Sequence, residues 1–586
     1  MYTPQTEDLK FTLNQIAGLD ELLAGGVFGD LSGDLVDAIL SEAGRFAADI
    51  IAPLNRAGDE HGCKLDPETH SVTTAPGWRE AYTQWCEAGW PALPCPVEFG
   101  GQGLPVMVSL AVQELWNTAA SAYGIGTLLT QGAINALKSH GADELKEKFL
   151  PNMVSGRWTG TMCLTEPQAG TDLGALKTRA EPAGDGSYRI SGTKIFITYG
   201  EHDLTENIIH LVLARLPGAP EGHRGISLFV VPKFMVGDDG SIGQRNDVKC
   251  IGIEHKMGIH GSPTATLQFG DEGGATGFLV GEENRGLNCM FTMMNDARLH
   301  VGMQGVAVAE RAFQQALAYA LERTQGSKPG HDGSVAIIEH ADVRRMLLDM
   351  KSTTAAARAS CYLCARALDL SEHAQDEDDR ASSAALAALL TPIAKAYGTD
   401  TGMAVASAGI QVHGGMGYIE ETGAAQHLRD VRITQIYEGT NGIQALDLVT
   451  RKLPLGNGAV VNGWLDELEN IARRLDGDLA PVGAELSGAI TAIRQATGWL
   501  LQRLGERDER AVASAPNYLH ALALATGTAA LARGVLAGSD VPGHDGRVQL
   551  LNYYAFNRLP HAGALTRIVM EGSAAIIDKS ADALVI

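Results

Sequence analysis

The period of the hydrophobic positions changes twice along the chain. Apolar residues recur with helical spacing over 31–51 and 106–150, which predicts an N-terminal helical region. Runs that alternate or are rich in β-branched residues, separated by Gly, Pro and Asp, then predict strands at 188–198, 207–215, 225–231 and 264–269. Helical spacing returns near Leu287, and we expect one long Pro-free helix there and three more long helices before residue 453.

These changes predict four domains. They are an N-terminal helical domain (1–155), a middle β domain (156–285), a helical bundle (286–453) and an extra C-terminal helical domain (454–586). The last boundary lies at Pro454 and the Gly/Asn-rich stretch that follows it. The predicted fold class is therefore α+β, mainly α.

Composition limits the classes of partner. The formal charge is 46 − 69 = −23, which disfavours a nucleic acid or an anionic membrane as partner. The N-terminus shows no secretory signal, and no apolar run reaches the length of a membrane helix. The eight cysteines are scattered, and we expect Cys361 and Cys364 to be buried helix residues rather than metal or redox groups. A reduced, cytoplasmic location is expected.

The segment 434–443, TQIYEGTNGI, is the strongest candidate for chemistry. Glu438 stands between an apolar stretch and a helix start that Thr440 or Asn441 can cap and that Pro454 stops. A carboxylate on a short connection beside apolar surface has a raised pKa, which suits a general base. Taken alone, the segment also fits an ordinary acid in the first turn of a helix.

Four further segments carry weaker signals. Residues 161–172, TMCLTEPQAGTD, form a loop that could offer N–H groups and hydroxyls to a ring edge or a phosphate, and Phe196 in SGTKIFIT could stack on a flat ring. Arg323 at a helix C-terminus could bind a pyrophosphate. The glycines of 409–418, GIQVHGGMGY, would let a bulky ligand approach the backbone, and His413 more readily satisfies a local hydrogen bond than binds a metal. Each also fits a plain loop, strand or helix end.

Taken together and in this order, these segments resemble the acyl-CoA dehydrogenase family. The matching motifs are MCLTEPQAGTD, SGTKIFIT, the long helix from Arg298 to ERTQG, QVHGGMGY and IYEGT, and the resemblance spans residues 89 to about 452. It implies a helical domain, a β-barrel domain and a helical bundle, in the order read from the hydrophobic pattern. It also implies FAD as cofactor. No metal is expected, because the sequence has no HExxH or paired-carboxylate metal motif.

The resemblance implies a set of FAD contacts: Met162, Leu164, Thr165, Gly170, Thr171, Phe196, Thr198, Arg323, Gln411, Gly414, Gly415 and Thr440. Two positions depart from the family pattern. Phe196 stands where the family usually has Trp, so stacking is kept and the indole N–H is lost. Gln325 stands where Phe is common, and the connection 326–339 is longer than usual.

Glu438 matches the catalytic base of the family. Some members place the base just before the arginine that opens the long helix, but that position is Ala297 here. The expected reaction is α,β-dehydrogenation of an acyl-CoA: Glu438 removes the α-proton, the β-hydride goes to the flavin, and the Glu438 N–H stabilises the enolate oxygen. The implied substrate contacts are Thr171, Asn295, Arg298 and Gly439.

The extra residues 454–586 place the chain with the long forms of the family. The stretch 413–448, together with the N-terminal lead and the acidic balance, most resembles enzymes that act on 3-(methylthio)propionyl-CoA in dimethylsulfoniopropionate breakdown, which makes that thioester the expected substrate. A general short-, medium- or long-chain fatty acyl-CoA dehydrogenase and an acyl-CoA oxidase are the alternatives. The dehydrogenase interpretation implies an electron-transfer flavoprotein as partner. We expect a homodimer, because the extra C-terminal domain would block a second dimer contact.

A non-enzymatic alternative comes from one family branch, which uses the flavin core as a DNA-associated damage-response protein with a basic C-terminal domain. From Leu453 onward this chain has 11 − 14 = −3 charges from Lys+Arg and Asp+Glu. Such a segment does not form a DNA-binding surface. We therefore expect an enzyme.

Overall fold

The computed structural model describes residues 2–237 and 239–577. The chain forms two compact units, each made of more than one segment. One consists of residues 46–105 and 119–297, and the other of residues 1–45, 106–118 and 298–586. Each is described below by itself.

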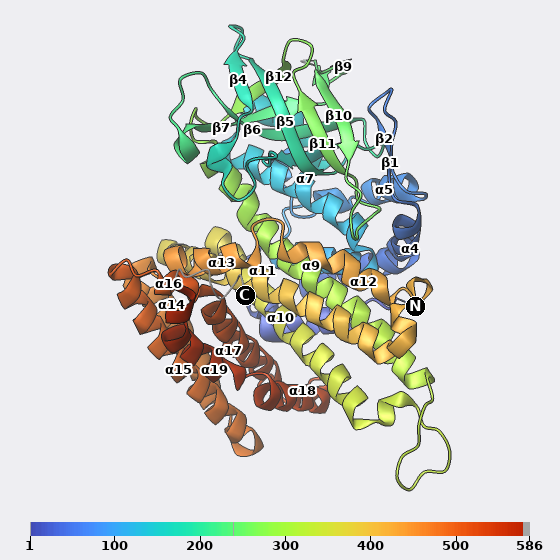
Figure 1. The fold of residues 1–586 in the computed structure, drawn as a ribbon, viewed down its shortest axis with the longest axis vertical. Helices are drawn as coiled ribbons and strands as arrows, with labels where there is room; N and C mark the ends of the chain where they lie inside the picture. Colours follow the sequence, from blue (N-terminus) through green and yellow to red (C-terminus); the bar gives the residue numbers. More distant parts are fainter. Residues whose placement is uncertain (1, 238, 578–586) are drawn as a thin grey trace, which may run out of the picture. The chain divides into compact units, whose positions relative to one another are not determined.

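The first unit contains the predicted β domain. Its main sheet has eight strands, in the order β10-β11-β5-β12-β7-β6-β3 with β4 beside β5 and β6 (Figure 1). Their bounds are β3 Trp158–Cys163, β4 Arg179–Pro182, β5 Tyr188–Thr198, β6 Asn207–Arg215, β7 Ile226–Pro232, β10 Val248–Ile253, β11 Thr264–Phe269 and β12 Ala275–Val280. The four predicted strands are confirmed as β5, β6, β7 and β11. The strands β4, β10 and β12, and the pair β8 (Phe234–Val236) and β9 (Ile242–Arg245), were not predicted.

The faces of this sheet explain which strands the pattern revealed. The strand β6 is buried almost along its whole length, as a run of apolar β-branched residues predicts for a strand covered on both faces. Its neighbour β5 alternates buried and exposed positions, which gives the period of two. Phe229, Phe269 and Ile190 pack in the core under these strands. Helices α4 (Ala52–His61), α5 (Trp78–Glu87), α7 (Ser121–His140) and α8 (Asp143–Val154) belong to the same unit.

The second unit is helical. The helices α10 (Ala341–His373) and α11 (Glu377–His413) pack along each other, and the end of α9 (Gly286–Glu322) packs with them around Met350 and Val412 (Figure 1). The expectation of three long helices between α9 and residue 453 is wrong. Two are long, and short helices follow, α12 (Ala424–Val431) and α13 (Asn441–Asp447), because glycines with positive φ at 414, 423 and 439 interrupt the helical backbone.

The predicted extra C-terminal region is helical in the part that the structure describes. It contains α14 (Ala459–Arg473), α15 (Ala480–Gly505), α16 (Arg510–Ala513), α17 (Ala515–Val535), α18 (His544–Asn557), α19 (His561–Arg567) and α20 (Ala574–Ile577). Residues 578–586 lie outside the described part. Helix α17 is buried on most sides and packs against α10, α11 and α13.

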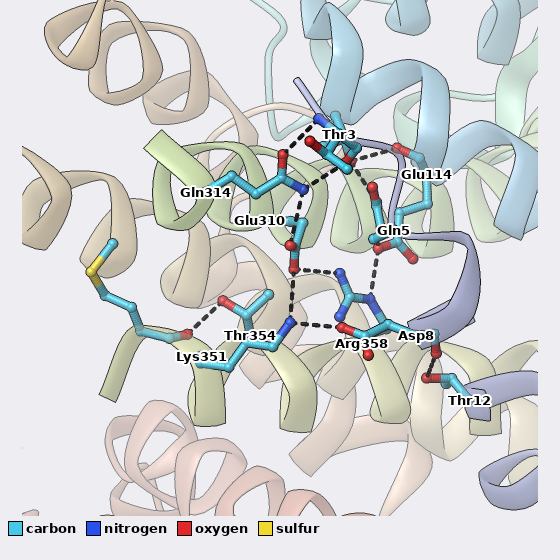
Figure 2. A network of polar contacts seen from close by, with 12 residues as sticks. Thr3, Gln5, Asp8, Thr12, Glu114, Glu310, Gln314, Lys351, Thr354 and Arg358 are labelled. Atoms are coloured by element: carbon cyan, nitrogen blue, oxygen red, sulfur yellow. Dashed lines mark hydrogen bonds and ion pairs between the residues drawn. The ribbon is translucent and has the colours of Figure 1, made fainter. Parts of the chain in front are cut away.

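A buried ionic network holds the helices of this unit together (Figure 2). Arg358 of α10 donates to Glu114 at 2.7 Å and to Glu310 at 2.9 Å, and all three side chains are almost fully buried. Burial opposes the charge of each group, yet the two carboxylates raise the pKa of Arg358, so the guanidinium is charged. Among the described residues, no helix combines the length and apolar character needed to cross a bilayer.

Candidate active site

Glu438 lies in a strained turn between two helical segments. A 3₁₀ turn, Arg432–Gln435, precedes it and α13 follows. Thr440 caps α13, since its hydroxyl accepts from the Ile443 N–H at 3.3 Å, which decides between the two predicted caps. Glu438 therefore precedes the cap by two residues and is not an acid of the first helical turn. Its φ of 55° is left-handed, a conformation that costs a non-glycine residue about 1–2 kcal/mol and is typical of functional sites.

The backbone of this turn is held by side chains from two helices. Arg298 Nε of α9 lies 3.4 Å from the Glu438 carbonyl oxygen. Gln444 Nε2 of α13 donates to the carbonyls of Glu438 (3.2 Å) and Gly439 (3.1 Å). Arg298 is itself buried and lies 3.7 Å from Asp447. These contacts bind the backbone carbonyls of the turn and do not involve the carboxylate of Glu438, which is therefore available to act on a substrate.

The electrostatics of the turn suit a base. Burial raises the pKa of Glu438 above its ordinary value, and the cations Arg298 and Lys395 offset only part of that rise. Lys395 of α11 is fully buried, and burial lowers its pKa to about 7 against the opposing effect of Asp400 and Glu438. The backbone N–H of Glu438 has no acceptor among the described residues, so it is available to a ligand oxygen.

In the other unit, Phe196 is an exposed aromatic platform. The register between β5 and β11 shifts between Lys194 and Ile197, and Phe196 sits in this bulge with a φ of 60°. Its side chain is 58% exposed, although it is one of the large apolar residues of the chain. A strained, solvent-facing ring of this kind fits stacking on a flat ligand such as a flavin. Thr198 lies two residues further along the same strand.

The loop that carries the other predicted flavin contacts is pinned to the same strand. Lys194 of β5 donates to Glu166 at 2.9 Å and to the Leu164 carbonyl at 3.0 Å. Burial opposes the charge of Glu166, but Lys194 outweighs it and lowers the pKa of Glu166 to about 2. The predicted contacts of this loop are placed as follows: Met162 is buried in β3, Leu164 and Thr165 are half-buried, and Gly170 and Thr171 are exposed.

The second unit presents the remaining predicted cofactor residues at helix ends. Arg323 directly follows α9 and is exposed, as is Gln411 near the end of α11. A Cβ built on Gly414 or Gly415 would meet nothing within 4 Å, so the backbone there is open to a ligand. His413 contacts the Gly409 carbonyl at 2.7 Å and stacks on Tyr319, which confirms its predicted local role.

The structure thus brings together one group of the predicted residues, Glu438, Gly439, Thr440 and Arg298. The exposed aromatic by itself suits stacking on a flat ring, and the exposed arginine by itself suits a phosphate. The role of each residue stays a prediction, including those of Thr171 and Asn295, which are both exposed. Sequence reasoning missed the residues that support the site, Lys395 and Asp400 on α11 and the Glu166–Lys194 pair. The only sequence signal of these supporting residues was a lysine, Lys194 or Lys395, inside an apolar segment.

Comparison with known proteins places the chain in a family. Four family models match it: acyl-CoA dehydrogenase, N-terminal domain (36–157), middle domain (161–272) and C-terminal domain (284–453), and acetyl-CoA dehydrogenase C-terminal like (464–579). The chain belongs to the acyl-CoA dehydrogenase family. The predicted fold and the predicted class, an FAD-dependent acyl-CoA dehydrogenase with a C-terminal extension, are confirmed.

Individual relatives extend over most of the chain. It is 45% identical over 529 residues to 3-methylmercaptopropionyl-CoA dehydrogenase of Ruegeria pomeroyi, covering 88% of each protein. It shares its fold with ACDH-11 of Caenorhabditis elegans (TM-score 0.81, 21% identity, 99% and 96% of the two chains). It also shares it with an acyl-CoA dehydrogenase of Bacillus anthracis complexed with FAD (TM-score 0.74, 22% identity, 94% and 92%).

Proposed function

We propose that this enzyme oxidises 3-(methylthio)propionyl-CoA to 3-(methylthio)acryloyl-CoA, with Glu438 as the base. The observation that carries the mechanism is the position of Glu438: a carboxylate with a raised pKa, in a turn whose carbonyls are already bound by Arg298 and Gln444. The substrate is supported by the 45% identity to 3-methylmercaptopropionyl-CoA dehydrogenase of Ruegeria pomeroyi, since methylmercapto and methylthio name the same group. The similarity extends into the C-terminal region.

The protein's own groups supply the proton chemistry. The α-proton of an acyl thioester is weakly acidic, and a base with a raised pKa accepts it more readily than an ordinary carboxylate. The negative charge that develops on the thioester oxygen needs a fixed donor, and the unpaired N–H of Glu438 is a candidate. FAD, when bound, accepts the β-hydride. Removal of the α-proton and the β-hydride leaves the α,β double bond.

From the family resemblance, we propose that Phe196, Thr198, Arg323, Gln411, Gly414 and Gly415 hold FAD. A ring platform, a guanidinium and open glycine backbone match the isoalloxazine, the pyrophosphate and a close backbone approach. We further propose an electron-transfer flavoprotein as the acceptor of the electrons and a homodimer as the assembly. The acceptor comes from the family resemblance, and the dimer comes from the expectation that the extra C-terminal domain blocks a second dimer contact.

The test is an anaerobic titration of the FAD-loaded enzyme with 3-(methylthio)propionyl-CoA, following the flavin absorbance. Butyryl-, octanoyl- and palmitoyl-CoA are run alongside. We expect fast stoichiometric bleaching by the thioether substrate and slower bleaching by the others. Preferential bleaching by a fatty acyl-CoA would overturn the proposed substrate and keep the enzyme class. Rapid peroxide formation during turnover in air would replace the dehydrogenase by an oxidase.

A further inference from the structure

We propose that Asp400, anchored by His520, is a positioning residue for Glu438, and that the C-terminal domain therefore takes part in setting the catalytic turn. Here the C-terminal domain means the described residues 454–577. The inference rests on the proposed role of Glu438 as the base. This domain lies outside the residues that the acyl-CoA dehydrogenase N-terminal, middle and C-terminal domain models match.

Asp400 holds the turn on both sides of Glu438. Its Oδ1 accepts from Gln435 Nε2 at 2.6 Å and from Asn441 Nδ2 at 2.7 Å. Gln435 precedes Glu438 by three residues, and Asn441 follows it by three. One carboxylate oxygen of α11 thus clamps the two ends of the strained turn, and we call this arrangement the Asp400 clamp.

The Asn441 end of the clamp is fixed in its orientation. Asn441 Oδ1 accepts from Lys395 Nζ at 2.8 Å and from the Thr399 hydroxyl at 3.2 Å. With its oxygen bound to a buried cation, its amide nitrogen is left to donate to Asp400. The orientation of the Asn441 amide therefore follows from the bonding pattern, and the helix start that Asn441 opens is tied to α11.

The second oxygen of Asp400 is bound by the C-terminal domain. His520 Nε2 of α17 lies 2.8 Å from Asp400 Oδ2. Helix α17 packs against both α11 and α13, so His520 reaches the clamp from a well-packed helix. Burial by itself would raise the pKa of Asp400, but the bonds from His520, Gln435 and Asn441 lower it, so the acceptor is a carboxylate.

The physical consequence is geometric. Glu438 has a left-handed backbone that relaxes unless its surroundings hold it. A displacement of about 1 Å at a reacting group costs up to about 100-fold in rate, even when its cause lies away from the chemistry. Loss of the His520 contact frees one oxygen of Asp400 and loosens both ends of the turn. The rate of flavin reduction should fall much more than substrate affinity, because the shift misplaces the reacting carboxylate, whereas only Gly439 of the four predicted substrate contacts lies in the turn.

The experiment compares FAD-loaded full-length variants in anaerobic stopped-flow reduction by an acyl-CoA that bleaches the wild type. We expect His520→Ala to lower the limiting reduction rate about 10-fold or more, with the substrate dissociation constant within about 2-fold. His520→Gln should restore most of the rate, because the amide nitrogen of Gln can donate to Asp400. FAD content and melting temperature are measured on every variant.

Arg558→Met is the matched control. Arg558 also links the C-terminal domain to the bundle, through an ion pair of 2.7 Å with Asp349 of α10, and it does not touch the clamp. Its reduction rate should stay at the wild-type value. A wild-type rate in His520→Ala, an equal loss in Arg558→Met, or no recovery in His520→Gln overturns the clamp alone. A wild-type flavin that no acyl-CoA bleaches overturns the proposed function and the clamp with it.

Discussion

Lys395 Nζ donates to Asn441 Oδ1 at 2.8 Å, three residues beyond Glu438. The lysine is fully buried, and burial lowers its pKa to about 7. Below about pH 7 the side chain of Lys395 is therefore an ammonium, which favours the carboxylate form of Glu438. The relationship ties the pH dependence of the base to a lysine on another helix.

Replacement of Lys395 by Met should move the pH profile of flavin reduction. The pKa of Glu438 is already raised, and loss of the ammonium removes one of the two charges that hold it down, so that pKa rises further. The limb of the profile where the rate increases with pH should shift to higher pH by up to about one unit. The measurement is the limiting reduction rate between pH 5 and pH 9. Lys328→Met, which removes an exposed lysine, is the control. An unshifted limb in Lys395→Met would rule out the coupling.

Phe196→Ala should weaken FAD binding. The ring is 58% exposed and would lose its stacking on the flavin, worth about 1–2 kcal/mol or about 10-fold in the dissociation constant. FAD affinity is measured by titration of the apoprotein. Ile251→Ala is the matched control, because Ile251 is 50% exposed on β10 of the same sheet. Equal FAD affinity in the two variants would remove Phe196 from the flavin site.

Arg358→Met should destabilise the helical unit strongly. The substitution leaves Glu114 and Glu310 buried without their shared cation (Figure 2). Removal of one partner from a buried ionic group costs about 3–5 kcal/mol. Arg345→Met on the same helix breaks only an exposed pair with Asp342 and should cost about 0.5 kcal/mol or less. Chemical denaturation compares the two variants, and similar losses would show that the buried network contributes little.

Local patterns predicted much of the fold. The strands β5 and β6 show a period of two or a continuous apolar run, and the cap at Thr440 needs only residues close in sequence. The short strand β4 was missed because four residues give no clear period. The expected third long helix failed because glycines break the backbone between α11 and α13.

Of the candidate site, the sequence predicted Glu438 and its motif but not the residues that support them. Glu438 stands out because its motif is local and recurs in a family. The residues that hold Glu438 in place do not stand out in the sequence. Asp400 contacts Gln435, Asn441 and His520 across separations of 35, 41 and 120 residues. No periodicity links such positions, and they meet only when α11, α13 and α17 pack. The same holds for Glu166 and Lys194. Their ion pair fixes a segment that the sequence identifies only as a loop.

The most direct test of the account is single-turnover flavin reduction in Glu438→Gln. Gln keeps the size and the backbone of the turn but cannot accept the α-proton. General-base catalysis contributes about 10²–10⁴-fold, so reduction by 3-(methylthio)propionyl-CoA should slow by that factor while FAD content and substrate affinity stay near those of the wild type. Reduction at the wild-type rate in Glu438→Gln would contradict the assignment of Glu438 as the base.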